Sequence, residues 1–333
     1  MGTSNTVRLR TVSCSDPGWR RVRRGRGFQY LDASGEPLGT EDVERIRTLA
    51  IPPAWTEVWI CPHPRGHLQA VGTDDAGRRQ YLYHPQWRQQ RDLEKFDRVA
   101  TYGEQLPLMR RRLRAQMRTE ATAPESERQR ILAVAVRLLD LGCFRPGSDS
   151  AADEGSHGLT TLERQHVRRD GDAIRFRFVG KAGVDHEITI EDPDVVHALD
   201  ATPHRRSRSA RLLETKVDGR WRPLTADEVN AYMAQVTGTD MTAKDFRTWH
   251  ATAEAAVTLA QDPSPTSGRG RRERIRSAYA AASDLLGNTP AMAKSAYVDP
   301  RLIDLFEAGV VLDHAPRSEN DRDRAVAALL SRA

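Results

Sequence analysis

The apolar run SERQRILAVAVRLLDLGCF, residues 126–144, is the clearest structural signal in this chain of 333 residues. Its apolar residues recur around the whole circumference of a helix, which is typical of a helix that is buried on most sides. The sequence FRPG that follows, residues 144–147, stops such a helix because proline cannot continue one. We therefore predict a buried helix with Arg145 at its end.

A β-hairpin is predicted after this helix, near residues 173–190. Here Ile174, Phe176 and Phe178 alternate with two arginines, and this period of two is typical of a strand with one buried face. The sequence GKAG then forms a turn, and the chain returns as a second strand. Lys181 is therefore expected at the tip of the hairpin.

The remainder of the C-terminal part is predicted to be mostly helical. Thr242 and Asp245 form a capping box, which places Arg247 in the second turn of a helix. The stretch QDPSPTSGRGR, residues 261–271, has instead the composition of a flexible loop.

A short helix is predicted near the end of the chain. Gly287 ends the helix before it, and Thr289 and Pro290 supply an N-cap and a first-turn proline. Tyr297 then falls at the far end of this helix. Taken alone, it is most simply interpreted as an aromatic residue that packs in the core.

The N-terminal part predicts short strands and turns. GFQYLDASGEPL, residues 27–38, places a Ser-Gly turn between alternating runs, and residues 57–84 repeat the pattern with glycine-rich turns. From about residue 86 the spacing becomes helical and highly charged. We predict an α+β fold with a small β-rich domain at residues 1–92 and a larger, mainly helical domain at residues 93–333.

The composition is that of a soluble protein with a polyanionic partner. It is 38% hydrophobic and 29% charged, and no apolar run approaches the roughly 20 residues of a membrane span. The N-terminus lacks the apolar stretch of a secretory signal, and the three cysteines are widely spaced, so we expect a cytoplasmic protein. The net charge is only +5, but arginines cluster in blocks, which favours nucleic acid as the partner. The blocks include residues 110–118, 205–211 and 269–276.

The chain contains no phosphate-binding GxxxxGK[ST] loop, HExxH motif, paired CxxC or cluster of carboxylates that predicts two metal ions. Chemistry by fixed cations and a side-chain nucleophile is therefore favoured. Attack of a tyrosine on a phosphodiester needs an ionisable phenol, positive charge around the transition state and an acid for the departing oxygen. Arginine suits the second role and lysine the third.

Several short blocks resemble, in sequence and order, the type IB DNA topoisomerases of the small poxvirus-like class found in bacteria. The resemblance covers most of the chain. The blocks are FRPGS around Arg145, GLTTLERQHV at 158–167, FRFVGKAG around Lys181, KDFRTWHA around Arg247, GNTPAMAKSAYVDP at 287–300 and, in the N-terminal part, GRRQYLYH at 77–84.

The resemblance implies a role for each of five residues. Tyr297 matches the nucleophile that forms a 3′-phosphotyrosyl bond, and Arg145 and Arg247 match the arginines that stabilise the transition state. Lys181 matches the general acid for the 5′-oxygen. Many relatives have histidine where this chain has Asn288, whose uncharged amide can donate a hydrogen bond but cannot exchange a proton in the reaction.

The resemblance also implies DNA contacts in the N-terminal domain. Gln80, Tyr81 and Tyr83 match the element that contacts DNA, and Arg78 and Arg79 beside them supply positive charge for the phosphates. An alternative interpretation is that the two tyrosines are ordinary strand residues with one packed and one solvated face.

Together these features predict a monomeric clamp around duplex DNA, with no obligate protein partner, that relaxes supercoils by nicking, strand rotation and resealing. This chemistry requires neither ATP nor a metal. Mg2+ can still alter the turnover rate through its effect on DNA. One alternative is a tyrosine recombinase or integrase, which ordinarily has histidine where this chain has Lys244. Another is an inactive architectural protein that only binds DNA.

Overall fold

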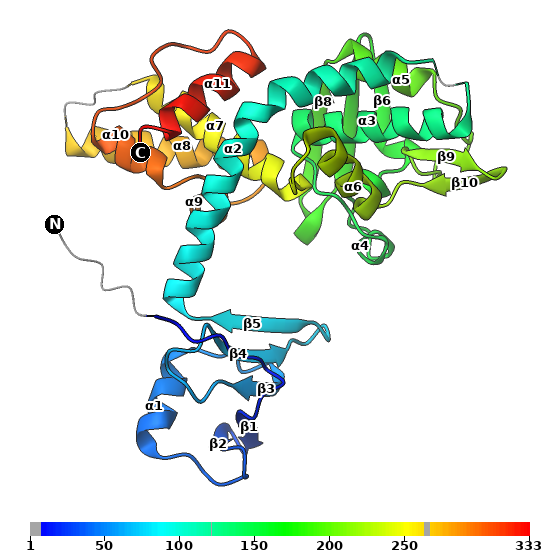
Figure 1. Cartoon of the computed structure of the whole chain (residues 1–333). Helices are drawn as coiled ribbons and strands as arrows, with labels where there is room; N and C mark the ends of the chain where they lie inside the picture. The colour runs from blue at the N-terminus through cyan, green and yellow to red at the C-terminus, as the bar shows by residue number, and fades with distance from the viewer. Residues whose placement is uncertain (1–7, 121, 263–266) are drawn as a thin grey trace. The chain divides into compact units, whose positions relative to one another are not determined.

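The computed structural model describes residues 8–120, 122–262 and 267–333. The chain separates into two compact units between Lys95 and Phe96, within one long helix, α2 (Pro85–Arg118) (Figure 1). The predicted domain boundary at 92/93 lies in the same helix. Within the predicted loop 261–271, residues 263–266 lie outside the described part, and residues from Gly268 onward already belong to helix α8.

The N-terminal unit is built on a five-stranded antiparallel sheet, as its turn-rich sequence predicts. The strand order is β2-β1-β3-β4-β5. Helix α1 (Thr40–Thr48), which the sequence analysis missed, buries Ile46 against Val58, Ile60 and Ala70 of this sheet. Its segment TEDVERIRT has too few apolar residues for a clear helical period. The strands are β1 (Trp19–Arg24), β2 (Gly27–Leu31), β3 (Thr56–Ile60), β4 (Leu68–Thr73) and β5 (Arg79–Tyr83).

The second unit is mainly helical, which confirms the predicted α+β class. Its central helix, α3 (Pro124–Gly142), is buried at every residue from 130 to 140, as the apolar run predicts. It packs against α5, α6, α7, β8 and β9. The other helices after α2 are α4 (Asp149–Asp153), α5 (Pro193–Asp200), α6 (Ala226–Thr237), α7 (Ala243–Ala260), α8 (Gly268–Leu286), α9 (Pro290–Ala296), α10 (Arg301–Glu307) and α11 (Glu319–Leu330).

The predicted hairpin is present as β7 (Ala173–Val179) and β8 (Asp185–Ile190). Ile174, Phe176 and Phe178 are buried, as the alternation predicts. A third strand, β6 (Val167–Asp170), pairs with β7 and was not anticipated, because its sequence VRRD is short and polar. A second hairpin, β9 (Glu214–Val217) and β10 (Arg220–Pro223), was also missed, although the Asp-Gly pair between its strands is a hairpin signal.

A buried ionic network holds the helices of this unit together. The Asp140 carboxylate on α3 accepts from Arg110 on α2 at 2.7 Å and from Arg137, and it lies 2.9 Å from His250 Nε2 on α7. Arg137 in turn donates to Glu319 of α11 at 2.8 Å. Four helices are therefore joined by a network of polar side chains, most of them buried.

Candidate active site

Arg247 is a buried cation on α7, with 4% of its surface exposed. Its guanidinium donates to the carbonyl of Leu286 at 2.9 Å and to that of Cys143, and both carbonyls belong to the C-terminal ends of neighbouring helices. Among the described residues, its Nε has no hydrogen-bond partner, and no carboxylate lies within ion-pair distance of the guanidinium. Arg247 is therefore a buried cation that is not part of a surface ion pair.

Tyr297 lies directly against this arginine. It is the C-cap residue of α9, as the sequence predicts, and its ring centroid is 5.4 Å from the Arg247 guanidinium carbon. The side chain is buried, as the packing interpretation required. The same tyrosine is thus a core residue and the neighbour of a buried cation.

The surroundings of Tyr297 favour its ionised form. Burial raises the pKa of the phenol, but the charge and hydrogen bonding of Arg247, with the charges of Arg145 and Lys244, outweigh burial and bring the pKa below its usual value. The pKa of Arg247 is lowered by burial and by repulsion from Arg145. The arrangement therefore assists a tyrosine that must lose its proton to act as a nucleophile.

Arg145 and Arg247 both line a cavity of about 190 Å³. Helix α3 is followed by its C-cap residue Cys143, which lies in the left-handed region with φ of 49°, and the half-buried Arg145 comes two residues later, as predicted. The cavity lies between this helix end, the β7–β8 hairpin and the end of α8, and its lining includes Gly180, His186 and Gly287. Two cations thus face one small hollow.

Asn288 follows the left-handed glycine that ends α8. Its backbone N–H donates to the Ser283 carbonyl at 3.1 Å, which fixes the turn. Both polar atoms of its side-chain amide are buried and have no hydrogen-bond partner in the described residues. Because buried polar groups are nearly always paired, this amide is a candidate for binding a ligand.

Lys181 lies in the turn between β7 and β8, as predicted. The turn closes through the Gly180 N–H, which donates to the Val184 carbonyl at 2.7 Å. The lysine is exposed, and the structure records no side-chain hydrogen bond or ion pair for it with the described residues. The structure therefore brings Arg145, Arg247 and Tyr297 together, places Asn288 beside them and leaves Lys181 on a turn at the border of the cavity.

The predicted DNA contacts of the N-terminal unit lie on β5 and the turn before it. Arg79, Tyr81 and Tyr83 are exposed on one face of this strand, and Leu82 packs toward the core from the other. The two tyrosine rings are parallel, with centroids 6.2 Å apart. Both rings are therefore accessible to solvent.

Gln80 lies on the opposite face of β5 from the tyrosines. It donates to the Asp74 carboxylate at 2.8 Å, and Arg78 pairs with the same carboxylate at 3.0 Å. These bonds lower the pKa of Asp74 to about 2, the largest contribution coming from the Arg78 backbone N–H. Of the two predicted arginines, only Arg79 has no ion-pair partner among the described residues.

Sequence reasoning did not assign Lys244, Thr252 or His186 to the site. Lys244 contributes to the lowered pKa of Tyr297, and its position one turn before Arg247 on the same helix was the available signal. Thr252 donates to the Tyr297 carbonyl at 3.1 Å and accepts from the Asp299 amide at 3.1 Å. No local sequence pattern predicts these hydrogen bonds between Thr252 and the segment around Tyr297.

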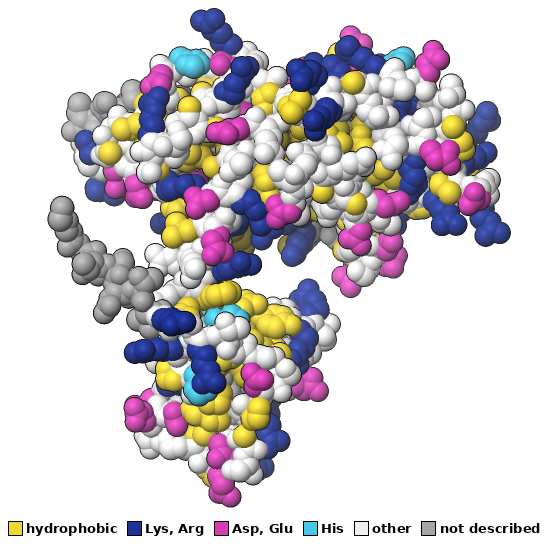
Figure 2. Space-filling model, in the orientation of Figure 1, with side chains coloured by type: hydrophobic (Ala, Val, Ile, Leu, Met, Phe, Trp, Pro, Cys, Tyr) yellow, Lys and Arg dark blue, Asp and Glu magenta, His cyan; other side chains and the backbone are white. Residues whose placement is uncertain are grey.

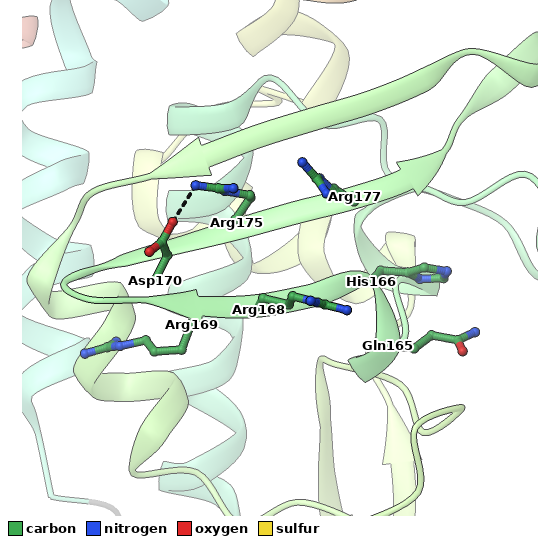
Figure 3. A pocket seen from close by; sticks show the side chains of 7 residues that line it. All are labelled: Gln165, His166, Arg168, Arg169, Asp170, Arg175 and Arg177. Atoms are coloured by element: carbon green, nitrogen blue, oxygen red, sulfur yellow. Dashed lines mark hydrogen bonds and ion pairs between the residues drawn. The ribbon is translucent and has the colours of Figure 1, made fainter.

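The outer face of the β6-β7-β8 sheet carries a second cationic hollow, of about 160 Å³ (Figure 3). Arg175 is paired with Asp170 there, and Arg177 with Glu187 at 2.8 Å. Figure 2 shows the same mixture of basic and acidic side chains over much of the visible surface. Two arginines of this hollow are therefore paired with carboxylates, whereas no ion pair is recorded for Arg247 among the described residues.

The described residues lack two kinds of feature. They contain no helix that is both long enough and apolar enough to cross a membrane. They also contain no group of three or more His, Cys, Asp and Glu side chains arranged to hold a metal ion.

Comparison with known proteins gives matches over both units. The model of the catalytic core of eukaryotic DNA topoisomerase I matches residues 84–303, and that of the N-terminal domain of bacterial DNA topoisomerase IB matches residues 27–74. The chain is also 27% identical over 287 residues to a DNA topoisomerase 1B of Acanthamoeba polyphaga mimivirus, with 84% of each chain covered. The five candidate catalytic residues fall within the first match, whereas residues 78–83 lie between the two.

Proposed function

This chain belongs to the type IB DNA topoisomerase family, and we propose that it relaxes supercoiled duplex DNA through a covalent bond between Tyr297 and a DNA phosphate. The enzyme is then an isomerase, because its substrate and product differ only in the winding of one strand around the other.

The observation that carries the assignment to Tyr297 is the buried, carboxylate-free guanidinium of Arg247 against its ring. A buried charge without a counter-ion is costly, by several kcal/mol in proteins. A DNA phosphodiester brings the missing negative charge. Arginine then donates to phosphate oxygens with its planar fork and stays charged throughout the reaction.

In the cleavage step, the Tyr297 phenolate oxygen bonds to phosphorus, and the bond from phosphorus to the 5′-oxygen breaks. The phenolic proton is lost to solvent before attack, a loss that Arg247, Arg145 and Lys244 favour by lowering the pKa of the phenol. The strand is left with a 3′-phosphotyrosine and a 5′-hydroxyl. Attack of that hydroxyl on the same phosphorus reverses the step and reseals the strand.

Arg145, Arg247 and Asn288 stabilise the pentacovalent transition state. The two arginines line one cavity and so approach the phosphate from the same side. The unpaired Nδ2 of Asn288 donates to a non-bridging oxygen, which satisfies one of its buried polar atoms. Its amide cannot serve as an acid or base, so it acts by hydrogen bonding alone.

Lys181 is the general acid for the departing 5′-oxygen. Its place on an exposed turn leaves the side chain free to reach a bound phosphodiester. Protonation of the leaving oxygen is a separate role from stabilising the phosphate, and the lysine comes from a different element than the arginines. The two roles can therefore be tested separately.

The proposal includes the way in which the enzyme meets DNA. It acts as a monomer in the cytoplasm, at the nucleoid, and its two units clamp the duplex. Arg79, Tyr81 and Tyr83 contribute contacts from the N-terminal unit, together with Gln80 and Arg78. ATP and metal ions are dispensable because each step exchanges one phosphoester bond for another. Mg2+ acts only through DNA.

The test compares wild-type protein with Tyr297→Phe on supercoiled plasmid in EDTA. Tyr232→Phe is the matched control, because Tyr232 is a tyrosine of equal burial on α6. Wild type and Tyr232→Phe are expected to relax the plasmid, and Tyr297→Phe to leave it supercoiled. The proposal is contradicted if all three proteins relax the plasmid equally, or if none of them relaxes it. Joining of two DNA sites identifies a recombinase, and binding without cleavage identifies an architectural protein.

A further inference from the structure

We propose that His186 is a positioning residue whose imidazole sets the distance between the turn that carries Lys181 and the turn that carries Asn288. The inference rests on the roles proposed above for those two residues. It concerns how the site is held together and adds no group that touches the phosphate.

The imidazole lies against the backbone of both turns. A Cβ atom built on Gly180, the residue before Lys181, would lie 2.6 Å from His186 Cδ2. A Cβ atom built on Gly287, the residue before Asn288, would lie 2.5 Å from His186 Cε1. Since real Cβ contacts are longer than this, the ring occupies the space that a side chain at either glycine would need. The His186 ring therefore acts as a spacer that keeps the turn at Gly180 apart from the turn at Gly287.

The His186 ring is also connected to the segment of Arg145 through stacked aromatic rings. His186 on β8 is the cross-strand partner of Phe178 on β7, and their rings stack with centroids 5.0 Å apart. Phe178 stacks in turn on Phe144 at 5.9 Å, and Phe144 directly precedes Arg145. A column of three rings thus connects the end of α3 with the hairpin and reaches the end of α8. Such a packed column transmits the position of one element to the next.

A neutral ring suits this position better than a charged group. Burial, followed by the charges of Arg247 and Arg145, lowers the pKa of His186, while Asp185 opposes this. The ring nitrogens form no hydrogen bond with the described residues, so the ring is held by packing. A cation here would repel both arginines, and a carboxylate would neutralise them and compete with the phosphate. Imidazole fills the space without either effect.

The first experiment measures single-turnover cleavage and DNA affinity of His186→Ala, with the exposed His197→Ala on α5 as the control. We expect His186→Ala to lose about 10- to 100-fold in cleavage rate, as displaced catalytic groups typically do, with DNA affinity close to wild type. His186→Phe retains an aromatic ring in the column and is expected to recover most of the rate. Wild-type cleavage by His186→Ala overturns the inference.

The second experiment asks whether the lost rate passes through Lys181. A substrate with sulfur as the 5′-leaving atom needs little help from a general acid. The deficit of His186→Ala is therefore expected to be several-fold smaller on this substrate than on ordinary DNA. An equal deficit on both substrates overturns the link to Lys181, because a general loss of packing would affect both alike.

The third experiment tests the contact between Gly180 and the His186 imidazole. Gly180 has a φ of −100°, which alanine adopts readily, so Gly180→Ala introduces only a clash with the imidazole. We expect this substitution to slow cleavage more in the wild-type background than in His186→Ala, where the ring is gone. Additive effects overturn the inference, and thermal unfolding of each variant shows that it is folded. Absence of cleavage by wild-type protein, in contrast, refutes the proposed function itself.

Discussion

The hydroxyl of Thr252 donates to the carbonyl of Tyr297 at 3.1 Å. Thr252 lies five residues after Arg247 on α7, so one helix carries the buried cation and also fixes the backbone of the tyrosine beside it. The same hydroxyl accepts from the amide of Asp299, which anchors the chain just beyond Tyr297. The relative position of cation and phenol is therefore set by one rigid element.

Thr252→Val is expected to slow cleavage by about 10- to 100-fold, because the Tyr297 backbone loses its anchor on α7. It also leaves a buried carbonyl and amide unpaired, at a cost of about 1–3 kcal/mol in the free energy of unfolding. Single-turnover cleavage and urea denaturation measure the two effects. Thr258→Val is the control, since the hydroxyl of Thr258 donates to the Glu254 carbonyl of the same helix and to no other described residue. Equal rates for the two variants contradict the expectation.

The cleavage rate is expected to rise with pH as Tyr297 ionises, and to level off below the usual pKa of a phenol, near 10. Positive charge favours phenolate, so removing it raises the pKa. Arg247→Ala should therefore shift the pH–rate profile to higher pH in addition to lowering the rate. Single-turnover cleavage across the pH range tests this, and an unshifted profile argues against Arg247 as the activating charge.

Lys181→Ala is expected to cleave ordinary DNA poorly and to recover on a substrate with a 5′-phosphorothiolate, whose sulfur leaves without a proton. Typical general acids contribute about 10²- to 10⁴-fold. The side chain is exposed, so the free energy of unfolding should stay at the wild-type value. Lack of recovery on the sulfur substrate removes the general-acid role.

Asp140→Ala is expected to lower the free energy of unfolding by about 1–3 kcal/mol, because Arg110 and Arg137 lose their shared buried carboxylate. Neither arginine is left without a counter-ion, since Arg110 keeps Asp323 and Arg137 keeps Asp192 and Glu319. The matched control is Asp200→Ala, which removes an exposed partner 3.4 Å from Arg169 and should cost about 1 kcal/mol or less. Chemical denaturation measures both. Similar losses would show that the buried network contributes no special stability.

Arg79→Gln is expected to weaken DNA binding and to reduce the slope of log affinity against log salt by about 1, as for the loss of one phosphate contact. Arg78→Gln should have a smaller effect, because Asp74 already neutralises that arginine. Binding titrations at several salt concentrations distinguish the two. An unchanged slope for Arg79→Gln places this arginine outside the DNA interface.

Features with local signals were predictable from the sequence. The buried helix α3, the hairpin with Lys181 at its turn and the short helix that ends at Tyr297 all follow from apolar period, glycine and proline. Strand β6 and helix α1 were missed because neither has a clear period of its own. Their formation depends on the elements that they pack against.

The sequence indicated which residues are candidates for the site but not how they are arranged. Short blocks in a recognisable order indicated the five candidates, whereas the burial of Arg247 depends on α7 lying between the ends of α3 and α8. The anchor from Thr252 and the spacer at His186 are likewise contacts between distant segments. Such contacts exist only after folding, so no local pattern in the sequence specifies them.

Four of the five candidate residues lie just beyond the end of a helix or in a turn: Arg145, Lys181, Asn288 and Tyr297. Only Arg247 is inside a helix. Because the chain leaves the site between one block and the next, intervening segments can lengthen or shorten without displacing the reacting groups. Divergence within the family is therefore expected to appear as length changes between the blocks, while the few residues around each turn keep their spacing.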